Sequence, residues 1–318
     1  MTKQNNNKKD FLSITDLSAQ GIWEVLYLAK KLKNQIKKLG KNKPFLKGKT
    51  LAMIFEKPSL RTHVSFQIAI NQLGGHALYL GPDHIAMGTR ESVSDVARVI
   101  SSMADIIMAR TFKHKIIKEL ADNSKVPVIN GLSDLEHPCQ ILADLMTIWE
   151  VKDRLDNLTI GYVGDGENNI PHSLCLASAM LGVNFQCAAP IGYWMKKEVV
   201  NQAKKDSKLT GSKILETKAP NEAITNVDIV YTDTWISMGD EKEKDKRLKI
   251  FFPYQINKKL MNLANKEAIF MHDLPAYRGN EVTDDVIEGK QSVVFQQAEN
   301  RLHVSKALIC YLLSVKNI

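Results

Sequence analysis

Four short segments, far apart in the chain, carry side chains that bind small charged molecules. They are Ser59-Leu60-Arg61-Thr62, His137-Pro138-Cys139-Gln140, Asp233-Thr234-Trp235-Ile236-Ser237-Met238-Gly239 and His272-Asp273-Leu274-Pro275. Guanidinium, imidazole, hydroxyl and amide groups of the first two suit an anion, whereas the carboxylates of the other two suit an ammonium group. The sequence therefore predicts binding of one small anion and one amino acid.

The first segment follows a short apolar run and begins a helical pattern. At a helix start, unpaired backbone N–H groups and the positive end of the helix dipole face an anion. Arg61 adds a planar guanidinium that can bind two phosphate oxygens. The alternative interpretation is an ordinary serine cap followed by a surface arginine.

Further cations occur where ligands collect in open α/β sheets. Arg110 stands just past a strand-like run, and His137 begins a helical pattern after another one. Arg301 lies in the last helical stretch. The plainer interpretations are that His137 caps a helix beside Pro138 and that Arg301 is solvated.

The acidic residues follow strand-like runs in the second half. Asp233 comes after the run 228–232, where a carboxylate can pair with an α-ammonium group, although a polar turn is the plainer interpretation. The segment 161–169 partly imitates a dinucleotide fingerprint. It lacks the third glycine and a convincing acidic ribose partner, so an NAD site is disfavoured.

Short apolar runs alternate with amphipathic stretches along the whole chain, which favours parallel sheets covered on both faces. Strands are predicted at 51–55, 76–80, 105–109, 126–130, 158–163, 184–189, 213–216, 228–232 and 268–271, and helices at 59–72, 92–103, 137–151, 169–181 and 297–313. We expect an α/β fold of two doubly wound parallel-sheet domains joined by interdomain helices. The predicted domains are 1–148 and 149–302, with the C-terminal helix 303–318 packing back onto the first.

Bulk properties narrow the functional class. A chain of 318 residues with 44% hydrophobic content can bury a large core, and no apolar run reaches the roughly 18 residues of a membrane span. The net charge of +8 comes from lysines spread along helical stretches, without a nucleic-acid-binding motif. Four cysteines lack metal-ligand spacing and are too few for a disulfide scaffold. We expect a cytoplasmic protein without metal or nucleic-acid ligand, whose polar start, 1–10, is neither a signal nor a transit peptide.

The motifs together resemble one family from end to end. The stretch 55–66 is similar to the carbamoyl-phosphate-binding segment of the carbamoyltransferases, usually S-T-R-T-R. H-P-x-Q, G-D-x-x-N-N, D-x-W-x-S-M-G and the H-x-L-P frame complete a resemblance to the ornithine-specific members of the aspartate/ornithine carbamoyltransferase family. The resemblance implies transfer of a carbamoyl group from carbamoyl phosphate to the δ-amine of L-ornithine, giving L-citrulline and phosphate without a cofactor.

The resemblance also implies roles for individual residues. The carbamoyl phosphate ligands are Ser59, Leu60, Arg61, Thr62, Arg110, His137, Gln140, Leu274 and Arg301, and the ornithine ligands are Asn169, Asp233, Ser237 and Met238. The residues expected to be catalytic are Arg110, His137, Asp273 and Arg301. Family members form homotrimers in which the segment matching 81–91 reaches a neighbouring subunit's site, so a homotrimer with sites near subunit interfaces is implied.

Four residues depart from the family pattern: Leu60 replaces a threonine, His63 an arginine, Ala86 a glutamine or histidine, and Asp273 a cysteine. The last matters most, because an alkyl ammonium near pKa 10.4 is only about one part in 2,500 neutral at pH 7. A carboxylate near pKa 4 is a weaker base than a thiolate, so we expect activity to rise further into alkaline pH than with cysteine. The alternative is a paralogue with another amine substrate or a non-catalytic ligand-binding role.

Overall fold

The computed structural model describes residues 8–85, 87–88, 90–237, 241–316 and 318. The chain divides into two compact units, the first formed by Met1–Ala143 and Asn300–Ile318, the second by Asp144–Glu299. The chain leaves the first unit within helix α5 (Pro138–Lys152) and returns within α12 (Val294–Leu312). The predicted α/β fold with two parallel-sheet domains is confirmed.

The first unit is built on a parallel sheet with strand order β2-β1-β3-β4. Its strands are β1 (Thr50–Phe55), β2 (His76–Leu80), β3 (Ile106–Arg110) and β4 (Val128–Leu132). Its helical elements are η1 (Ile14–Asp16), α1 (Ala19–Leu39), α2 (Leu60–Gln72), α3 (Val93–Ser101) and α4 (His114–Asn123), together with the parts of α5 and α12 that belong to it.

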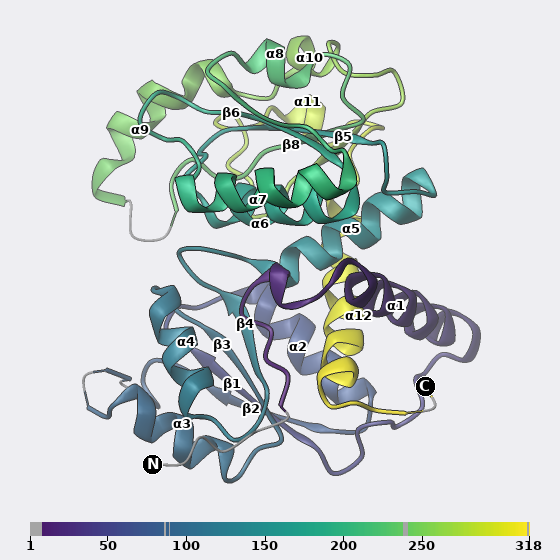
Figure 1. Ribbon diagram of the computed structural model, residues 1–318, viewed down its shortest axis with the longest axis vertical. Helices are drawn as coiled ribbons and strands as arrows, with labels where there is room; N and C mark the ends of the chain where they lie inside the picture. The colour runs from purple at the N-terminus through teal and green to yellow at the C-terminus, as the bar shows by residue number, and fades with distance from the viewer. Residues whose placement is uncertain (1–7, 86, 89, 238–240, 317) are drawn as a thin grey trace. The chain divides into compact units, whose positions relative to one another are not determined.

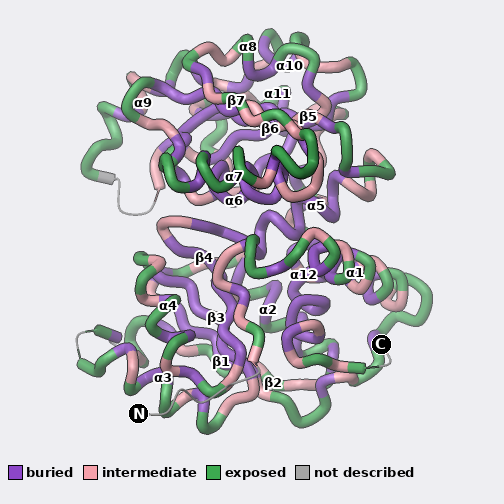
Figure 2. Tube along the Cα trace, in the orientation of Figure 1, coloured by how far each residue is buried: buried purple, intermediate pink, exposed green. Residues whose placement is uncertain are grey.

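Alternation of side chains along the strands explains how both faces of this sheet are covered. Ala52, Ile54 and Ile107 belong to one core cluster with residues of α3 and α4. The intervening strand residues, such as Met53, point to the opposite face, where α2 packs (Figure 1). Strands β1, β3 and β4 are accordingly buried along most of their length, whereas the edge strand β2 is largely exposed (Figure 2).

The second unit is built on a parallel sheet with strand order β7-β6-β5-β8-β9. Its strands are β5 (Thr159–Val163), β6 (Asn184–Ala188), β7 (Ile214–Thr217), β8 (Ile229–Tyr231) and β9 (Ile269–Met271). Its remaining helical elements are α6 (Asn169–Leu181), α7 (Lys197–Thr210), α8 (Pro220–Ile224), η2 (Glu241–Glu243), α9 (Lys244–Phe251), η3 (Phe252–Tyr254), α10 (Lys258–Met261) and α11 (Asp284–Ile287).

Helices cover both faces of this second sheet as well. Val163, Val230 and Phe270 pack in one cluster with residues of α8, α10 and α11. Helices α6 and α7 lie together on the other face (Figure 1). No described helix is long and apolar enough to cross a membrane.

Each sheet contains one place where the strand order reverses. In the first unit the chain moves from β1 outward to β2 and then returns to β3 on the other side, so β1 and β3 flank the reversal. In the second unit β5 and β8 flank it in the same way. Ligands of open α/β sheets bind at the carboxyl ends of such strand pairs. The topology therefore directs attention to the turns after β1, β3, β5 and β8.

Candidate active site

The turn after β1 forms the helix terminus that the sequence predicts. Ser59 caps α2, and its hydroxyl accepts a hydrogen bond from the N–H of Thr62 at 3.3 Å. Arg61 lies in the first turn of α2 and is half-buried, whereas the side chain of Leu60 is 74% exposed. Losing the usual hydroxyl at Leu60 therefore leaves the cap and the backbone donors of this helix in place.

A buried network joins four of the predicted anion ligands. The hydroxyl of Thr62 accepts from Arg301 Nη2 at 3.1 Å and from Arg110 Nη1 at 3.5 Å. Arg301 Nη1 also donates to Gln140 Oε1. These side chains come from α2, the end of β3, α5 and α12, which are far apart in sequence. The fold thus gathers two guanidinium groups around one hydroxyl in the first unit.

Two features direct Arg110 toward this network. The register between β3 and β4 shifts between Ala109 and Arg110, and such irregularities redirect side chains at strand ends. Glu56, just past β1, receives a backbone bond from Phe112 at 2.7 Å through its carboxylate, and its own N–H donates to the carbonyl of Arg110 at 2.9 Å. Glu56 therefore ties together the two strand ends that flank the reversal in the first sheet.

His137 is buried beside the same cations. Burial lowers its pKa well below the ordinary value, and the charges of Arg301, Arg110, Lys57 and Arg61 lower the pKa further. The imidazole is therefore neutral near pH 7 and can donate only one N–H bond. A neutral donor among arginines suits the oxygen of a polarised carbonyl.

The acidic residues of the second unit lie at the corresponding edge of the other sheet. β8 and β9 are parallel neighbours, with Tyr231 opposite Met271. Asp233 and Asp273 each follow two residues later, so the register brings the two carboxylates side by side. Asp233 accepts from Asn168 Nδ2 at 2.6 Å and from its neighbour's backbone N–H, that of Thr234, also at 2.6 Å.

The oxygen and nitrogen atoms of Asp233, His272 and Asp273 approach within 4.8 Å of one another. A metal ion does not fit this group well, because both ring nitrogens of His272 are engaged. Nδ1 accepts from the N–H of Leu274 at 2.9 Å, so the neutral ring carries its hydrogen on Nε2, which faces Glu281 Oε1 at 3.2 Å. His272 therefore offers no lone pair to a cation.

Leu274 adopts a conformation that side chains rarely take. Its φ is 59°, in the left-handed region, where a non-glycine residue is strained. The hydrogen bond from its N–H to buried His272 holds this conformation. Strain of this kind is found where a fold must direct a backbone group toward a ligand.

Sequence reasoning missed a buried ion pair behind this site. Arg247 on α9 donates to Asp165 Oδ2 at 2.7 Å and to the carbonyl of Trp235 at 3.0 Å. Its guanidinium also lies over the rings of Tyr193 and Phe251, 5.1 and 5.9 Å from their centroids. Arg247 therefore connects the turn after β5 to the segment after β8. The lysine-rich stretch around it predicts only a solvated helix.

The structure also places the other residues singled out in the sequence. Asn169 begins α6, but it is Asn168, not selected beforehand, that donates to Asp233. Ser237 is half-buried, whereas Met238 and Ala86 lie outside the described residues. His63 stacks on Tyr79 with ring centroids 4.5 Å apart.

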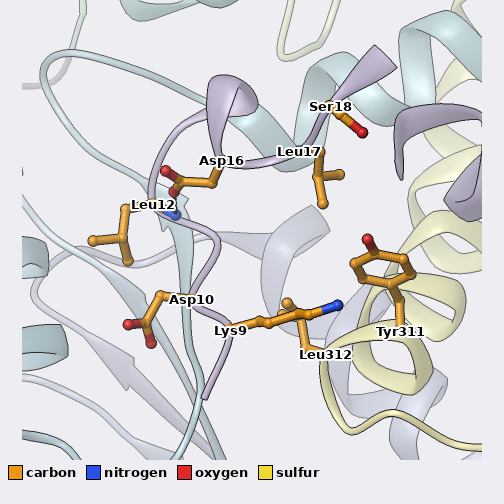
Figure 3. A pocket seen from close by; sticks show the side chains of 8 residues that line it. All are labelled: Lys9, Asp10, Leu12, Asp16, Leu17, Ser18, Tyr311 and Leu312. Carbon is orange, nitrogen blue, oxygen red and sulfur yellow. Dashed lines mark hydrogen bonds between the residues drawn. The ribbon is translucent and has the colours of Figure 1, made fainter. Parts of the chain in front are cut away.

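An open pocket of about 530 Å³ lies elsewhere in the first unit (Figure 3). It is lined by the N-terminal segment and the end of α12, where Lys9 Nζ lies 5.3 Å from the ring centroid of Tyr311. It contains none of the site residues predicted from the sequence. The chemistry therefore concentrates at the two strand reversals.

The fold and the two sites define a two-domain α/β protein with one cationic and one acidic ligand site. The chain belongs to the aspartate/ornithine carbamoyltransferase family. Residues 9–150 match the family description "carbamoyl-P binding domain", and residues 156–312 match "Asp/Orn binding domain". These ranges contain the cationic and the acidic sites respectively, apart from Arg301, which lies within the second match.

Individual relatives carry a more specific name. The chain is 50% identical over 305 residues to an ornithine carbamoyltransferase of Anoxybacillus flavithermus, covering 96% of both chains. It is 47% identical to the solved ornithine carbamoyltransferase of Pyrococcus furiosus, with a TM-score of 0.94 and 98% of each chain covered. The anabolic enzyme of Campylobacter jejuni is 42% identical, with a TM-score of 0.90, covering 96% of this chain and 98% of that one.

Proposed function

We propose that this protein transfers the carbamoyl group of carbamoyl phosphate to the δ-amine of L-ornithine, giving L-citrulline and phosphate. The observation that carries the proposal is the charge of the two strand-reversal sites. One gathers Arg110 and Arg301 around Thr62, which suits a phosphorylated substrate, and the other gathers Asp233 and Asp273, which suits a diamino acid. Family membership and the relatives' names support the same reaction.

The cationic site accounts for the activation of carbamoyl phosphate. The α2 terminus with Ser59, Leu60 and Arg61 would bind the phosphate, and leaving-group charge would develop against Arg61. Thr62, Arg110 and neutral His137 would donate to the carbamoyl oxygen, where the oxyanion develops. Gln140 would accept from the carbamoyl NH₂, and Arg301 holds both Gln140 and Thr62 in place.

The acidic site accounts for recognition and activation of the amine. Asp233, Asn169, Ser237 and Met238 would bind the amino acid, and Asp273 would lie beside the attacking amine. The strained Leu274 would offer its carbonyl to the carbamoyl NH₂. Holding both reactants on one protein can supply about 7–11 kcal/mol of the barrier. The chemistry proposed for these groups needs neither a metal nor an organic cofactor.

We also propose a homotrimer with sites near the subunit interfaces, in the cytoplasm. Leu60, Val64 and Ile68 are exposed on α2 at a spacing of four residues, so they form one apolar strip. A strip of this kind on a helix surface is suited to burial against another subunit. Four buried free cysteines fit a reducing compartment. Light scattering on the purified protein should give three times the 35.7 kDa chain mass.

The first domain would comprise residues 1–148 with the helix 303–318, and the second residues 149–302. This division assigns carbamoyl phosphate to the first domain and ornithine to the second. Isotope-labelled carbamoyl phosphate titrated into the protein should perturb amide signals of 55–62 before those of the segment after β8.

The decisive experiment is citrulline formation from carbamoyl phosphate and L-ornithine, with putrescine, N-acetylornithine and aspartate in parallel. Turnover with ornithine alone is the expected result. Turnover with another amine would replace the substrate while keeping the anion site. A folded protein that binds carbamoyl phosphate but turns over none of the four would favour the non-catalytic alternative.

A further inference from the structure

We propose that Asp233 and Asp273 work as one carboxyl pair that shares a single proton and thereby keeps the bound substrate's δ-amine neutral. The catalytic half of this inference rests on the proposed function, whereas the proton sharing is a property of the protein alone. The pair exists because an aspartate occupies the position that carries a cysteine in the family pattern.

Strand register places the two carboxyl groups together. Both residues follow a paired position of parallel strands, Tyr231 on β8 and Met271 on β9, by the same number of residues. Neighbouring strands lie about 4.8 Å apart. Oxygen atoms of the two side chains accordingly approach within 4.8 Å. At this separation, repulsion between two carboxylates favours a proton on one of them.

The surroundings of Asp273 offer no hydrogen-bond donor to one of its oxygens. Its Oδ1 is shielded from solvent and receives no hydrogen bond from any donor of the described residues. The same oxygen lies 3.5 Å from Nδ1 of His272, which itself accepts from the N–H of Leu274. On this side, the carboxyl pair therefore meets a further acceptor atom.

Asp233 supplies the ionised half of the pair. Asn168 and the N–H of Thr234 both donate to its carboxylate, which stabilises the charged form. Nevertheless burial and the adjacent charge of Asp273 raise the pKa of Asp233 well above its ordinary value. A buried carboxylate within 4.8 Å of a second, partly buried one cannot easily ionise together with it, so the pair retains one proton to higher pH than a lone aspartate.

The other titratable groups around the pair do not neutralise it. Glu281 adds a further negative charge, and burial raises the pKa of Tyr162 and Tyr231 well above the ordinary value. Nδ1 of His272 is occupied as the acceptor of the Leu274 N–H. No lysine or arginine of the described residues pairs with either carboxylate; the nearby Arg247 bonds Asp165. The shared proton therefore balances part of the negative charge of the two carboxyl groups.

Proton bookkeeping shows what the pair does for the reaction. When ornithine binds as R–NH₃⁺ beside the singly protonated pair, one proton leaves to solvent. The remaining proton can lie on the amine, which gives the doubly ionised pair with R–NH₃⁺, or on the carboxyl groups, which gives the singly protonated pair with R–NH₂. Repulsion between the carboxylates favours the second arrangement, so the δ-amine becomes neutral. Its lone pair then bonds to the carbamoyl carbon, the bond from that carbon to the phosphate oxygen breaks, and the nitrogen's second proton leaves with phosphate as HPO₄²⁻.

This arrangement explains how aspartate can stand where cysteine is usual. A lone carboxylate lies about six pKa units below an alkyl ammonium and would rarely take its proton. A second carboxylate nearby raises the pKa of the carboxyl pair, so the difference from the pKa of the ammonium group becomes smaller. Aspartic dyads in other folds hold a proton for the same reason.

The proton is tested first in the free protein, independently of activity. Infrared difference spectra between pH 5 and 9 should show a protonated carboxyl C=O band near neutral pH that disappears in both Asp233→Asn and Asp273→Asn. Asp144→Asn is the control, because Asp144 is equally buried in the same unit but accepts from Tyr231 and Gln297 instead of facing another acid. Survival of the band in either single variant would overturn proton sharing, as would its absence from the wild type.

Kinetic measurements then test whether the carboxyl pair assists the reaction by keeping the attacking amine neutral. Asp273→Asn should lower kcat on the order of 10²-fold with little change in the ornithine KM. Asp273→Cys should restore activity and shift the rising limb of the pH profile to lower pH. Superimposable profiles of Asp273→Cys and wild type would refute the catalytic half. A band that behaves as expected in a protein without carbamoyl transfer would leave the pair intact and reject the proposed function instead.

Discussion

The two units use the same structural position for opposite electrostatic purposes. In the first unit Arg110 ends β3, which flanks the reversal of strand order, and in the second Asp233 follows β8, which flanks the other reversal, while Asp273 follows the neighbouring strand β9. The first unit places cations there, and burial together with their charge lowers the pKa of His137. The second places carboxylates, and burial together with the charge of Asp273 raises the pKa of Asp233. In the proposed function, topology fixes where each ligand binds, while the residue types fix which charge it must have.

The two sites also differ in how their charges are held. Arg110 and Arg301 donate hydrogen bonds to neutral groups, a hydroxyl and an amide. The carboxylates of Asp233 and Asp273 face each other, so a proton or a substrate ammonium must balance them. In this proposal the arginines give the anion site a positive charge that does not change with pH, whereas the carboxyl pair of the amine site exchanges a proton.

Arg110→Met should have the largest effect, because it removes positive charge from the anion site. We expect kcat/KM for carbamoyl phosphate to fall by about 10³-fold, since one preorganised donor contributes 10² to 10³ and the charge adds to it. Arg98→Met, an exposed arginine paired with Asp95 in the same unit, should leave activity unchanged. Steady-state kinetics at varied carbamoyl phosphate decide the matter, and equal losses in both variants would contradict the assignment.

Asp233→Asn should act on the other substrate. Losing the carboxylate while keeping its shape should lower kcat/KM for ornithine by about 10²-fold, because a desolvated charge pair is broken. Binding of carbamoyl phosphate, measured calorimetrically, should change by less than about threefold. A larger loss of carbamoyl phosphate affinity than of ornithine affinity would remove the contrast between the two sites.

Much of this contrast follows from sequence because the motifs are local. Ser59 caps a helix that begins at the next residue, and Asp233 follows a short apolar strand, so each can be placed from its neighbours alone. The predicted strands are all present, with ends that differ by one or two residues. Local pattern was sufficient wherever a functional group stands directly on the end of an element.

Pairing across the sheet could not be predicted in the same way. The contact between Asp233 and Asp273 depends on β8 and β9 lying in matching register, which no local pattern records. The bond from Asn168, the residue that caps α6, to Asp233 was likewise not predicted, because it depends on how the helix start is placed beside β8. The predicted role of Asn169 as an ornithine ligand stays a prediction. Arg247 was hidden within a charged stretch, although Phe251, four residues further along the same helix, is the kind of apolar neighbour that indicates burial.

Arg247→Met tests the contrast between the two sites by disturbing the position of the amine site without removing one of its proposed ligands. Arg247 contacts Asp165 and the carbonyl of Trp235, two residues from Asp233, so it acts as a positioning residue. We expect the ornithine KM to rise about tenfold with kcat and the carbamoyl phosphate KM little changed. Breaking a buried ion pair should also lower the free energy of unfolding by about 3 kcal/mol. The double variant with Asp165→Asn should lose less than the sum of the single variants, and full additivity would show that the pair does not act as a unit.

Lys306→Met should have the smallest effect and tests whether every buried cation of the first unit serves the anion. Lys306 is fully buried on α12, where its ammonium donates to Asn42 Oδ1 at 2.8 Å, and burial lowers its pKa to about 8. An unfolded lysine titrates near 10.4, so the folded protein carries a constant penalty below pH 8 that disappears between pH 8 and about 10.4. Replacing it with methionine should therefore raise the free energy of unfolding by about 1 kcal/mol at pH 7, after allowing for the lost bond to Asn42. Denaturant titrations at pH 7 and pH 10 should show that this gain vanishes at the higher pH while citrulline formation stays at the wild-type rate. A fall in activity at unchanged stability would instead place Lys306 among the cations that act on the anion site.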